Sequence, residues 1–256
     1  MKRLVWIMVL SCIFYWPGPP ALPAAEETPS VEHLVRRIEE EFGVKIIYRQ
    51  LPEGMNPAII FSVPRPQDYK ILANYLMMLR EELRKYPECF YQKTGLDGIA
   101  LVKRQFYDSR PLEGLYQRNT RIIVIDFLRN RGHGIKQRLN VHHELYHMLE
   151  SQNGLAWRFR DWENINRPGF SYQTQKNLQP GANPVNYFAP PVPGFVTYYA
   201  MESPAEDRAE LFAALMIDSQ RRVVHRWLEK DTVLRQKVHA LRAAVIALCP
   251  EMAQRL

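Results

Sequence analysis

The chain has 256 residues, of which 46% are hydrophobic and 24% charged, and its 34 Lys and Arg residues outnumber its 27 Asp and Glu residues. These proportions are typical of a globular protein and argue against wholesale disorder, collagen-like repeats and a multi-span membrane protein. The length suits one large domain or two small ones, and either can bury a hydrophobic core.

Residues 1–25 have the organisation of a secretory signal peptide. A basic start precedes an apolar run of 13 residues over 4–16, and Pro- and Ala-rich sequence follows as far as Ala25. The run is shorter than the roughly 17–25 residues of a membrane-spanning helix, so we expect cleavage near Ala24 or Ala25 rather than a retained anchor. Lipid attachment at Cys12 is disfavoured, because this residue lies very early in the chain. The mature protein is predicted to be exported, either to the periplasm or to the extracellular space.

The first half of the mature chain contains both helical and strand patterns and no internal repeat. Helical spacing of apolar residues and short β-branched runs define most of these elements. Residues 50–66 contain four prolines and are predicted to be a loop. The predicted elements are a helix over 31–42, a strand over 44–49, a helix over 67–85, and strands over 98–103 and 120–126.

The second half is predicted to be mainly helical, with helices over 135–151 and 203–219. Ser203-Pro204-Ala205-Glu206 opens the later helix with a capping serine, a proline in the first turn and a glutamate three residues after the cap. Residues 152–196 are rich in Pro, Gly, Asn and aromatic residues and follow no period. A long irregular stretch inside a compact domain is usually functional, so we expect this one to fold over or beside a cleft.

The net positive charge is concentrated at the C-terminus. The mature chain keeps 32 basic and 27 acidic residues, and residues 220–256, with eight basic and three acidic residues, account for the whole excess. Apolar residues recur there at helical spacing, so we expect two amphipathic helices with a basic, solvated face. The alternative is a docking patch for an acidic partner such as an anionic lipid, a polysaccharide or nucleic acid. No nucleic-acid-binding motif accompanies these charges, so nucleic-acid binding is not expected.

Cys89 and Cys249 are the cysteines that remain after removal of the signal peptide. An even number of cysteines in an exported protein permits one disulfide, and two buried free thiols are equally compatible with the sequence. Neither cysteine has Cys or His beside it at metal-ligand spacing.

The strongest functional signal is His143-Glu144-Leu145-Tyr146-His147, an H-E-x-x-H pattern on a predicted helix. Residues at i and i+4 stand one turn apart on the same face, so the two imidazoles can share one cation. Glu144 falls beside this pair and can reach a water on the metal without displacing a ligand. Imidazole nitrogens bind zinc readily, and a third protein ligand leaves the fourth position open. We therefore predict a zinc site with His143 and His147 as ligands.

Two glutamates near the start of the later helix are candidates for completing this site. Glu206 and Glu210 lie four residues apart in the run Glu-Asp-Arg-Ala-Glu. One can bind the metal while the other accepts a hydrogen bond from the far nitrogen of a ligating histidine. The alternative for Glu206 is a plain helix-capping glutamate, in which case Glu202 or Glu210 would supply the ligand.

The H-E-x-x-H motif and the following E-x-x-A-E run resemble the gluzincin metallopeptidases. The resemblance is strongest to bacterial zinc-binding peptidases related to the catalytic domain of anthrax lethal factor. It implies that Glu206 is the third zinc ligand, that Glu210 supports a ligating histidine, and that Tyr199 stabilises the oxyanion of the transition state. Tyr198 and Tyr172 are the alternatives to Tyr199.

The resemblance also implies a fold, an α+β zincin-like metallopeptidase domain. Such a domain has a small mixed sheet, the H-E-x-x-H helix and a following helix that carries the third ligand. We expect residues 26–256 to form one domain, with 26–119 unmatched, a catalytic core over 120–220 and basic C-terminal helices over 221–256. Residues 162–172 are similar to a further segment of this group, except that Arg167 interrupts its Asn-Pro pair.

The expected function is zinc-dependent hydrolysis of peptide bonds in a peptide or protein substrate. Zinc would lower the pKa of its water to about 7, and Glu144 would act as the general base. One alternative is an inactive, zinc-binding exported protein that binds a partner through residues 152–198 and the C-terminal helices. Another is a zinc hydrolase of non-peptide amides, which the sequence does not distinguish from a peptidase.

Overall fold

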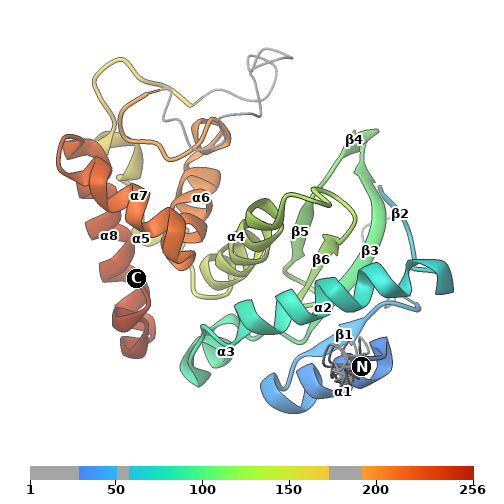
Figure 1. The fold of residues 1–256 in the computed structure, drawn as a ribbon. Helices are drawn as coiled ribbons and strands as arrows, with labels where there is room; N and C mark the ends of the chain where they lie inside the picture. The colour runs from blue at the N-terminus through green and yellow to red at the C-terminus, as the bar shows by residue number, and fades with distance from the viewer. Residues whose placement is uncertain (1–28, 51–57, 173–191) are drawn as a thin grey trace, which may run out of the picture.

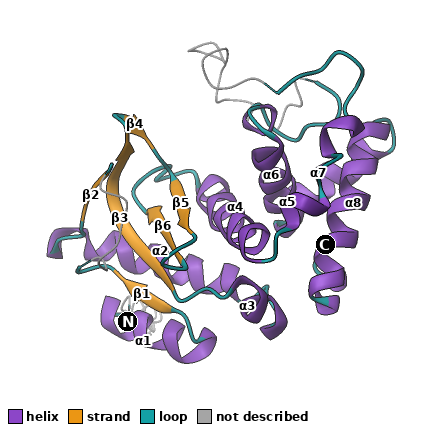
Figure 2. Cartoon of the chain, turned by 180° about the vertical axis from the view of Figure 1, so that it is seen from behind, coloured by secondary structure: helices purple, strands orange, loops and turns teal. Residues whose placement is uncertain are grey.

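The computed structural model describes residues 29–50, 58–172 and 192–256, so the predicted signal peptide lies outside the described residues. A six-stranded mixed sheet carries helices on one side and adjoins a second group of helices (Figure 1, Figure 2). The strands are β1 (Lys45–Ile47), β2 (Ile59–Ser62), β3 (Gly98–Tyr107), β4 (Arg110–Pro111), β5 (Gly114–Gln117) and β6 (Ile122–Asp126). The helices are α1 (Val31–Phe42), α2 (Tyr69–Leu83), α3 (Glu88–Thr94), α4 (Gly134–Gln152), α5 (Leu155–Arg158), α6 (Pro204–Met216), α7 (Asp218–Leu228) and α8 (Thr232–Leu248). Short 3-10 helices cover Pro66–Asp68, Trp162–Ile165, Tyr199–Met201 and Pro250–Gln254.

The sheet is organised around the long strand β3. Its first half pairs in parallel with β1 on one side and with β6 on the other, and its second half pairs antiparallel with β2 and β4. β5 pairs antiparallel with β6 and ends the strand order β1-β3-β6-β5, so it forms an edge of the sheet. The apolar run of β6 is buried along its whole length, since the strand lies between β3 and β5 and packs against α4.

Helix α4 lies between the sheet and the C-terminal helices (Figure 1). It packs against β5 and β6 on one side and against α6 on the other, and it also contacts α2 and α3. Every side chain from Val141 to Glu150 is buried. A helix buried on all sides has no single apolar face, and its polar residues must therefore find partners inside the protein. Within the described residues, no helix is both long and apolar enough to cross a membrane.

Several predicted element boundaries were wrong. The predicted loop over 50–66 contains β2, because the neighbouring prolines obscure a short apolar run that pairs at an edge of β3. The predicted helix over 203–219 ends at Met216, because Ile217 takes an extended conformation before α7 begins. The strand predicted over 98–103 continues to Tyr107. Helices α3 and α5 and the strands β4 and β5 were not predicted.

The two helices expected in the basic C-terminal segment are confirmed as α7 and α8, but their charges do not all face solvent. Lys237 is completely buried and pairs with Asp207 of α6, so the prediction of a solvated basic face is wrong for this residue. Arg221 and Arg235 donate to backbone carbonyls at helix ends. An acidic partner for this segment stays a prediction. The exposed cations of this segment include Arg222, Arg226, Lys230 and Arg235.

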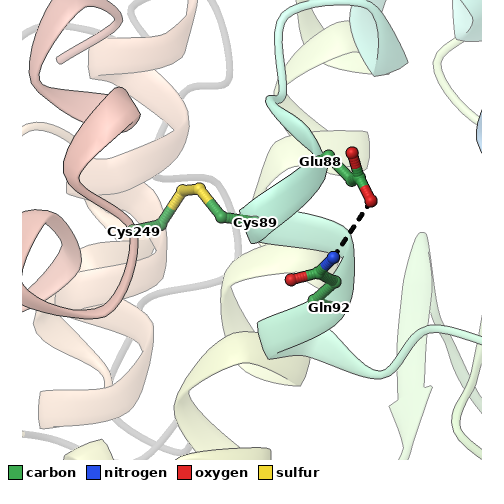
Figure 3. The surroundings of a disulfide bond; sticks show 4 residues. All are labelled: Glu88, Cys89, Gln92 and Cys249. Carbon is green, nitrogen blue, oxygen red and sulfur yellow. Dashed lines mark hydrogen bonds between the residues drawn. A yellow bond between two sulfur atoms is a disulfide. The ribbon is translucent and has the colours of Figure 1, made fainter.

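A disulfide joins two elements that are distant in the sequence. Cys89 on α3 is bonded to Cys249 directly after α8, with the two Cα atoms 5.6 Å apart (Figure 3). Because α3 packs against α4, the bond ties the C-terminal helices to the N-terminal half of the protein beside the H-E-x-x-H helix. The sequence left the disulfide and two free thiols open, and the structure contains the disulfide.

Replacing both Cys89 and Cys249 by serine is expected to lower the free energy of unfolding by about 2–5 kcal/mol. The bond closes a loop with a sequence separation of 160 residues, and a crosslink over so long a loop strongly restricts the unfolded chain. Urea unfolding of the double variant and the oxidised wild type, followed by circular dichroism, measures the difference. Equal unfolding midpoints and slopes would show that the disulfide contributes no stability.

Candidate metal centre

Helix α4 brings the residues of the H-E-x-x-H motif to one face. His143 and His147 are one turn apart, and their Nε2 atoms lie 3.0 Å from one another. Both side chains are buried, at 6% and 8% exposure. The Tyr116 ring of β5 stacks on the His147 imidazole at a centroid distance of 5.4 Å and holds that ring in place. The edge of the sheet therefore helps to orient one of the two histidines.

Glu206 meets the two histidines from the start of α6. Ser203 caps this helix by accepting a hydrogen bond from the Glu206 backbone N–H, which fixes the first turn. The Glu206 Oε2 atom lies 2.9 Å from His143 Nε2 and 3.3 Å from His147 Nε2. Among the described residues, these three side chains form a group whose ligand atoms all lie within 4.8 Å of one another.

This donor set fits a zinc ion. Ligand atoms around a tetrahedral zinc with bonds of 2.0–2.1 Å are about 3.3 Å apart, and the three separations here are 2.9–3.3 Å. Two imidazole nitrogens and a carboxylate oxygen that converge in this way need a proton or a cation between them. Three protein ligands also leave the fourth tetrahedral position open, as in catalytic zinc sites.

Glu210 contacts the outer side of one histidine. Its Oε1 atom lies 2.9 Å from His143 Nδ1, and its Oε2 accepts a hydrogen bond of 2.8 Å from the Thr197 hydroxyl. A proton held on Nδ1 by this carboxylate leaves the lone pair of Nε2 pointing toward His147 and Glu206. Thr197 also accepts a hydrogen bond from the backbone N–H of Ala200, so it connects Glu210 to the turn that carries Tyr199.

The charges of the cluster are strongly coupled. Burial by itself lowers the pKa of His143, but the carboxylates of Glu206 and Glu210 outweigh it and raise this pKa well above its ordinary value. Burial raises the pKa of Glu206, and hydrogen bonds from His143 and His147 outweigh it and hold this pKa far below its ordinary value. The cluster thus stabilises a positive charge between its ligand atoms, and a metal ion can take the place of the proton.

Glu144 and Tyr199 lie together at a cavity next to this cluster. Glu144 is 5% exposed, and burial raises the pKa of its carboxyl group. The Tyr199 ring lies 5.9 Å from the His143 ring, and burial raises the pKa of its phenol, which therefore stays protonated. The cavity has a volume of about 280 Å³ and is lined by Pro111, Leu112, Glu113, Gly114, Lys136, Asn140, His143, Glu144, Tyr199 and Glu210.

The two tyrosines considered as alternatives to Tyr199, and Glu202 as an alternative to Glu206, lie outside the site. The Tyr172 hydroxyl donates to Asp207 Oδ2 at 2.6 Å, and Tyr198 is 38% exposed, so Tyr199 is the one of the three that lines the cavity. Glu202 does not belong to the group of possible metal ligands. His142 faces away from the cluster, with its Nε2 atom 2.7 Å from an oxygen of Glu82 on α2.

A buried network holds α6 in place behind the cluster. Asp207, the residue after Glu206, accepts hydrogen bonds from Trp162 Nε1 at 2.8 Å and from the Tyr172 hydroxyl. It also accepts one from Lys237 Nζ at 2.7 Å, and Lys237 donates in addition to the carbonyl of Gly194. Both ends of the segment between α4 and α6 are therefore tied to the helix that carries Glu206.

Sequence reasoning did not single out several residues that shape the site. They contact it from elements that no motif marks, or pair with residues far away in the sequence. Lys237 lies among the apolar positions of a predicted helix, and this position was the one sequence signal that could have indicated its burial. The residues that were not predicted are Gly114, Tyr116, Thr197, Asp207 and Lys237.

The α+β fold brings the buried H-E-x-x-H helix and the His-His-Glu cluster together beside a cavity. Residues 121–245 match the model of a family described as putative zinc-binding metallo-peptidase. The fold is similar to a crystal structure of a putative zinc-binding metallo-peptidase from Bacteroides caccae, with a TM-score of 0.52 and 18% identity. That match covers 91% of this chain and 94% of the other. No curated protein matches the chain.

These comparisons confirm the resemblance to bacterial zinc-binding peptidases and the α+β metallopeptidase fold. The family match begins at β6 and ends within α8, so it includes both helices of the cluster. The structural likeness extends the common fold to residues before 121 that the sequence left unmatched. The relation to anthrax lethal factor stays a prediction.

Proposed function

We propose that the protein is an exported zinc metallopeptidase that hydrolyses peptide bonds at the cavity beside His143, His147 and Glu206. The observation that carries this proposal is the convergence of three ligand atoms next to a cavity that also contains the Glu144 carboxylate. An acid that is neither engaged by the ligand set nor exposed to bulk solvent is the group that a general base requires.

The residues around the cavity have distinct tasks in this reaction. When bound, zinc supplies a Lewis acid that polarises a carbonyl and acidifies water. Glu144 accepts the proton of the attacking water and delivers it to the leaving amine. The protonated Tyr199 donates a hydrogen bond to the oxyanion that develops on the substrate carbonyl. Glu210 keeps the His143 ring in the orientation and tautomer that metal binding needs.

The position of β5 favours a peptide over other amides as the substrate. β5 is at the end of the strand order, and the residues that lead into it, Leu112 and Glu113, line the cavity together with its first residue, Gly114. An edge strand offers a row of backbone N–H and C=O groups to which an extended peptide can bind as an additional strand. A small non-peptide amide cannot form this series of backbone hydrogen bonds with the strand.

Two independent features support export. The first 25 residues have the organisation of a signal peptide, and Cys89 and Cys249 form a disulfide. Disulfides persist in oxidising compartments and are rare in the cytosol, so the bond agrees with a protein that leaves it.

Cleavage of an unstructured protein by purified residues 26–256 tests the proposal. We expect fragments to appear, to disappear after treatment with a zinc chelator, and to return when zinc is added. Zinc binding without any cleavage, with unstructured proteins and peptide libraries as substrates, would contradict the proposal and favour a binding protein. Cleavage that resists the chelator would exclude the metal mechanism.

Glu206→Ala is expected to weaken zinc binding by more than about 100-fold, because it removes one of three protein ligands. Elemental analysis after dialysis against a competing chelator measures the retained zinc. Glu202→Ala is the matched control, since Glu202 lies one turn before Glu206, directly after the 3-10 helix Tyr199–Met201, and outside the ligand group, and it should retain wild-type zinc. Stoichiometric zinc in Glu206→Ala together with zinc loss in Glu202→Ala would move the third ligand to Glu202.

A further inference from the structure

Strand β5 and helix α4 meet at Gly114 and Glu144. A Cβ atom added to Gly114 would lie 2.5 Å from Glu144 Oε1, 2.6 Å from its Cγ and 2.7 Å from its Cδ. Real Cβ atoms essentially never approach other atoms closer than 3.0 Å. The backbone of Gly114 does not lie in the left-handed region, so its φ angle would accept any residue. The requirement for glycine at this position therefore comes from the Glu144 side chain.

The strand cannot move away to make room, because it is held on two sides. Gly114 is paired in register with Ile125 of β6. The carbonyl oxygen of the preceding residue, Glu113, accepts hydrogen bonds of 3.0 Å from the Asp126 backbone N–H and from Asn140 Nδ2. Asn140 lies one turn before Glu144 on α4, so the helix itself fixes its distance from the strand. A side chain at position 114 would displace the Glu144 carboxylate rather than β5.

We propose that Gly114 and Asn140 are positioning residues for Glu144. The Glu144 carboxylate packs against the backbone of Gly114. Asn140 fixes the distance between β5 and α4 through its hydrogen bond to the Glu113 carbonyl oxygen. This inference rests on the proposed role of Glu144 as general base. Neither residue belongs to the ligand group of His143, His147 and Glu206, so both act on the base and leave the metal unaffected.

The Gly114→Ala substitution distinguishes an effect on the general base Glu144 from an effect on metal binding. We expect kcat to fall by about 100-fold, the loss that a displacement of about 1 Å can cause, with KM and zinc stoichiometry close to wild type. In a Glu144→Gln background the same substitution should cause no further loss, because the two changes act on one group. Gly134→Ala is the matched control, because a Cβ atom there meets nothing within 4 Å. It should keep wild-type kcat.

Thermal unfolding of the metal-free variants tests the contact without activity. Gly114→Ala should lower Tm when Glu144 is present, and should lower it much less in a Glu144→Ala background, where the colliding atoms are gone. Equal Tm losses in both backgrounds, or a wild-type kcat in Gly114→Ala, would overturn the inference. If the wild type cleaves no peptide, the proposed function fails and the Tm comparison alone decides whether Gly114 positions Glu144.

Discussion

Glu144→Gln should reduce kcat/KM for peptide hydrolysis by about 10²–10⁴-fold while the protein keeps its zinc. Glutamine has the shape of glutamate and fits the same buried position against Gly114, but it cannot accept a proton from water. The three candidate metal ligands are untouched, so the metal content should not change. Initial rates on a fluorogenic peptide and zinc analysis of the same preparation measure both quantities.

A second carboxylate in the cavity provides the control for this prediction. Glu113 lines the same cavity as Glu144, and Glu113→Gln removes the same charge. This variant should keep most of the activity, because the contacts proposed for Glu113 belong to its backbone, which the substitution keeps, and its side chain has no part in the proposed proton transfer. Full activity in Glu144→Gln, or an equal loss in both variants, would show that Glu144 is not the base.

Lys237→Met should lower the free energy of unfolding by about 3–5 kcal/mol, the typical cost of breaking a buried ion pair from one side. Lys237 is completely buried, and its Nζ atom lies 2.7 Å from Asp207 Oδ2. Methionine fills a similar volume but leaves the buried Asp207 carboxylate without its cation. Urea unfolding monitored by circular dichroism, at neutral pH and in the presence of chelator, measures the loss.

The same variant should depend on pH in a defined direction. Burial raises the pKa of Asp207 above its ordinary value, and the Lys237 ammonium opposes this rise. Without the ammonium the folded protein binds a proton at Asp207 more readily than the unfolded chain. The stability deficit of Lys237→Met should therefore shrink as the pH falls and grow as the pH rises through the raised pKa.

Two comparisons show whether the ion pair causes the loss. Lys237→Met combined with Asp207→Asn should be more stable than Lys237→Met alone, because no buried charge remains uncompensated. Lys230→Met removes an exposed cation just after α7 and should change the stability by less than about 0.5 kcal/mol. Equal losses in Lys230→Met and Lys237→Met would contradict the account of the buried pair.

The elements that could be predicted from sequence have local causes. The H-E-x-x-H spacing placed His143 and His147 on one helical face, and the Ser-Pro-Ala-Glu cap placed Glu206 at the start of a helix. β6 could be recognised because four consecutive apolar residues leave few alternatives to a buried strand. Each of these signals lies within a few residues of the feature that it predicts.

The remaining features depend on contacts between distant segments. β5 is only four residues long, and its half-buried side chains give no alternating pattern. The sequence therefore could not show that Gly114 and Tyr116 contact residues of α4. Lys237 falls among the apolar positions of its helix, but its partner Asp207 lies 30 positions away, so the ion pair could not be inferred from the sequence. The pairing of Cys89 with Cys249 likewise depends on how α3 and α8 pack.

A zinc titration of the metal-free protein shows whether His143, His147 and Glu206 hold the ion on which hydrolysis depends. Peptide cleavage is measured after each addition of zinc to residues 26–256. We expect the rate to rise from zero in proportion to zinc and to reach a plateau at one ion per chain. Cleavage that is independent of zinc, or fully loaded protein that cleaves nothing, would contradict it.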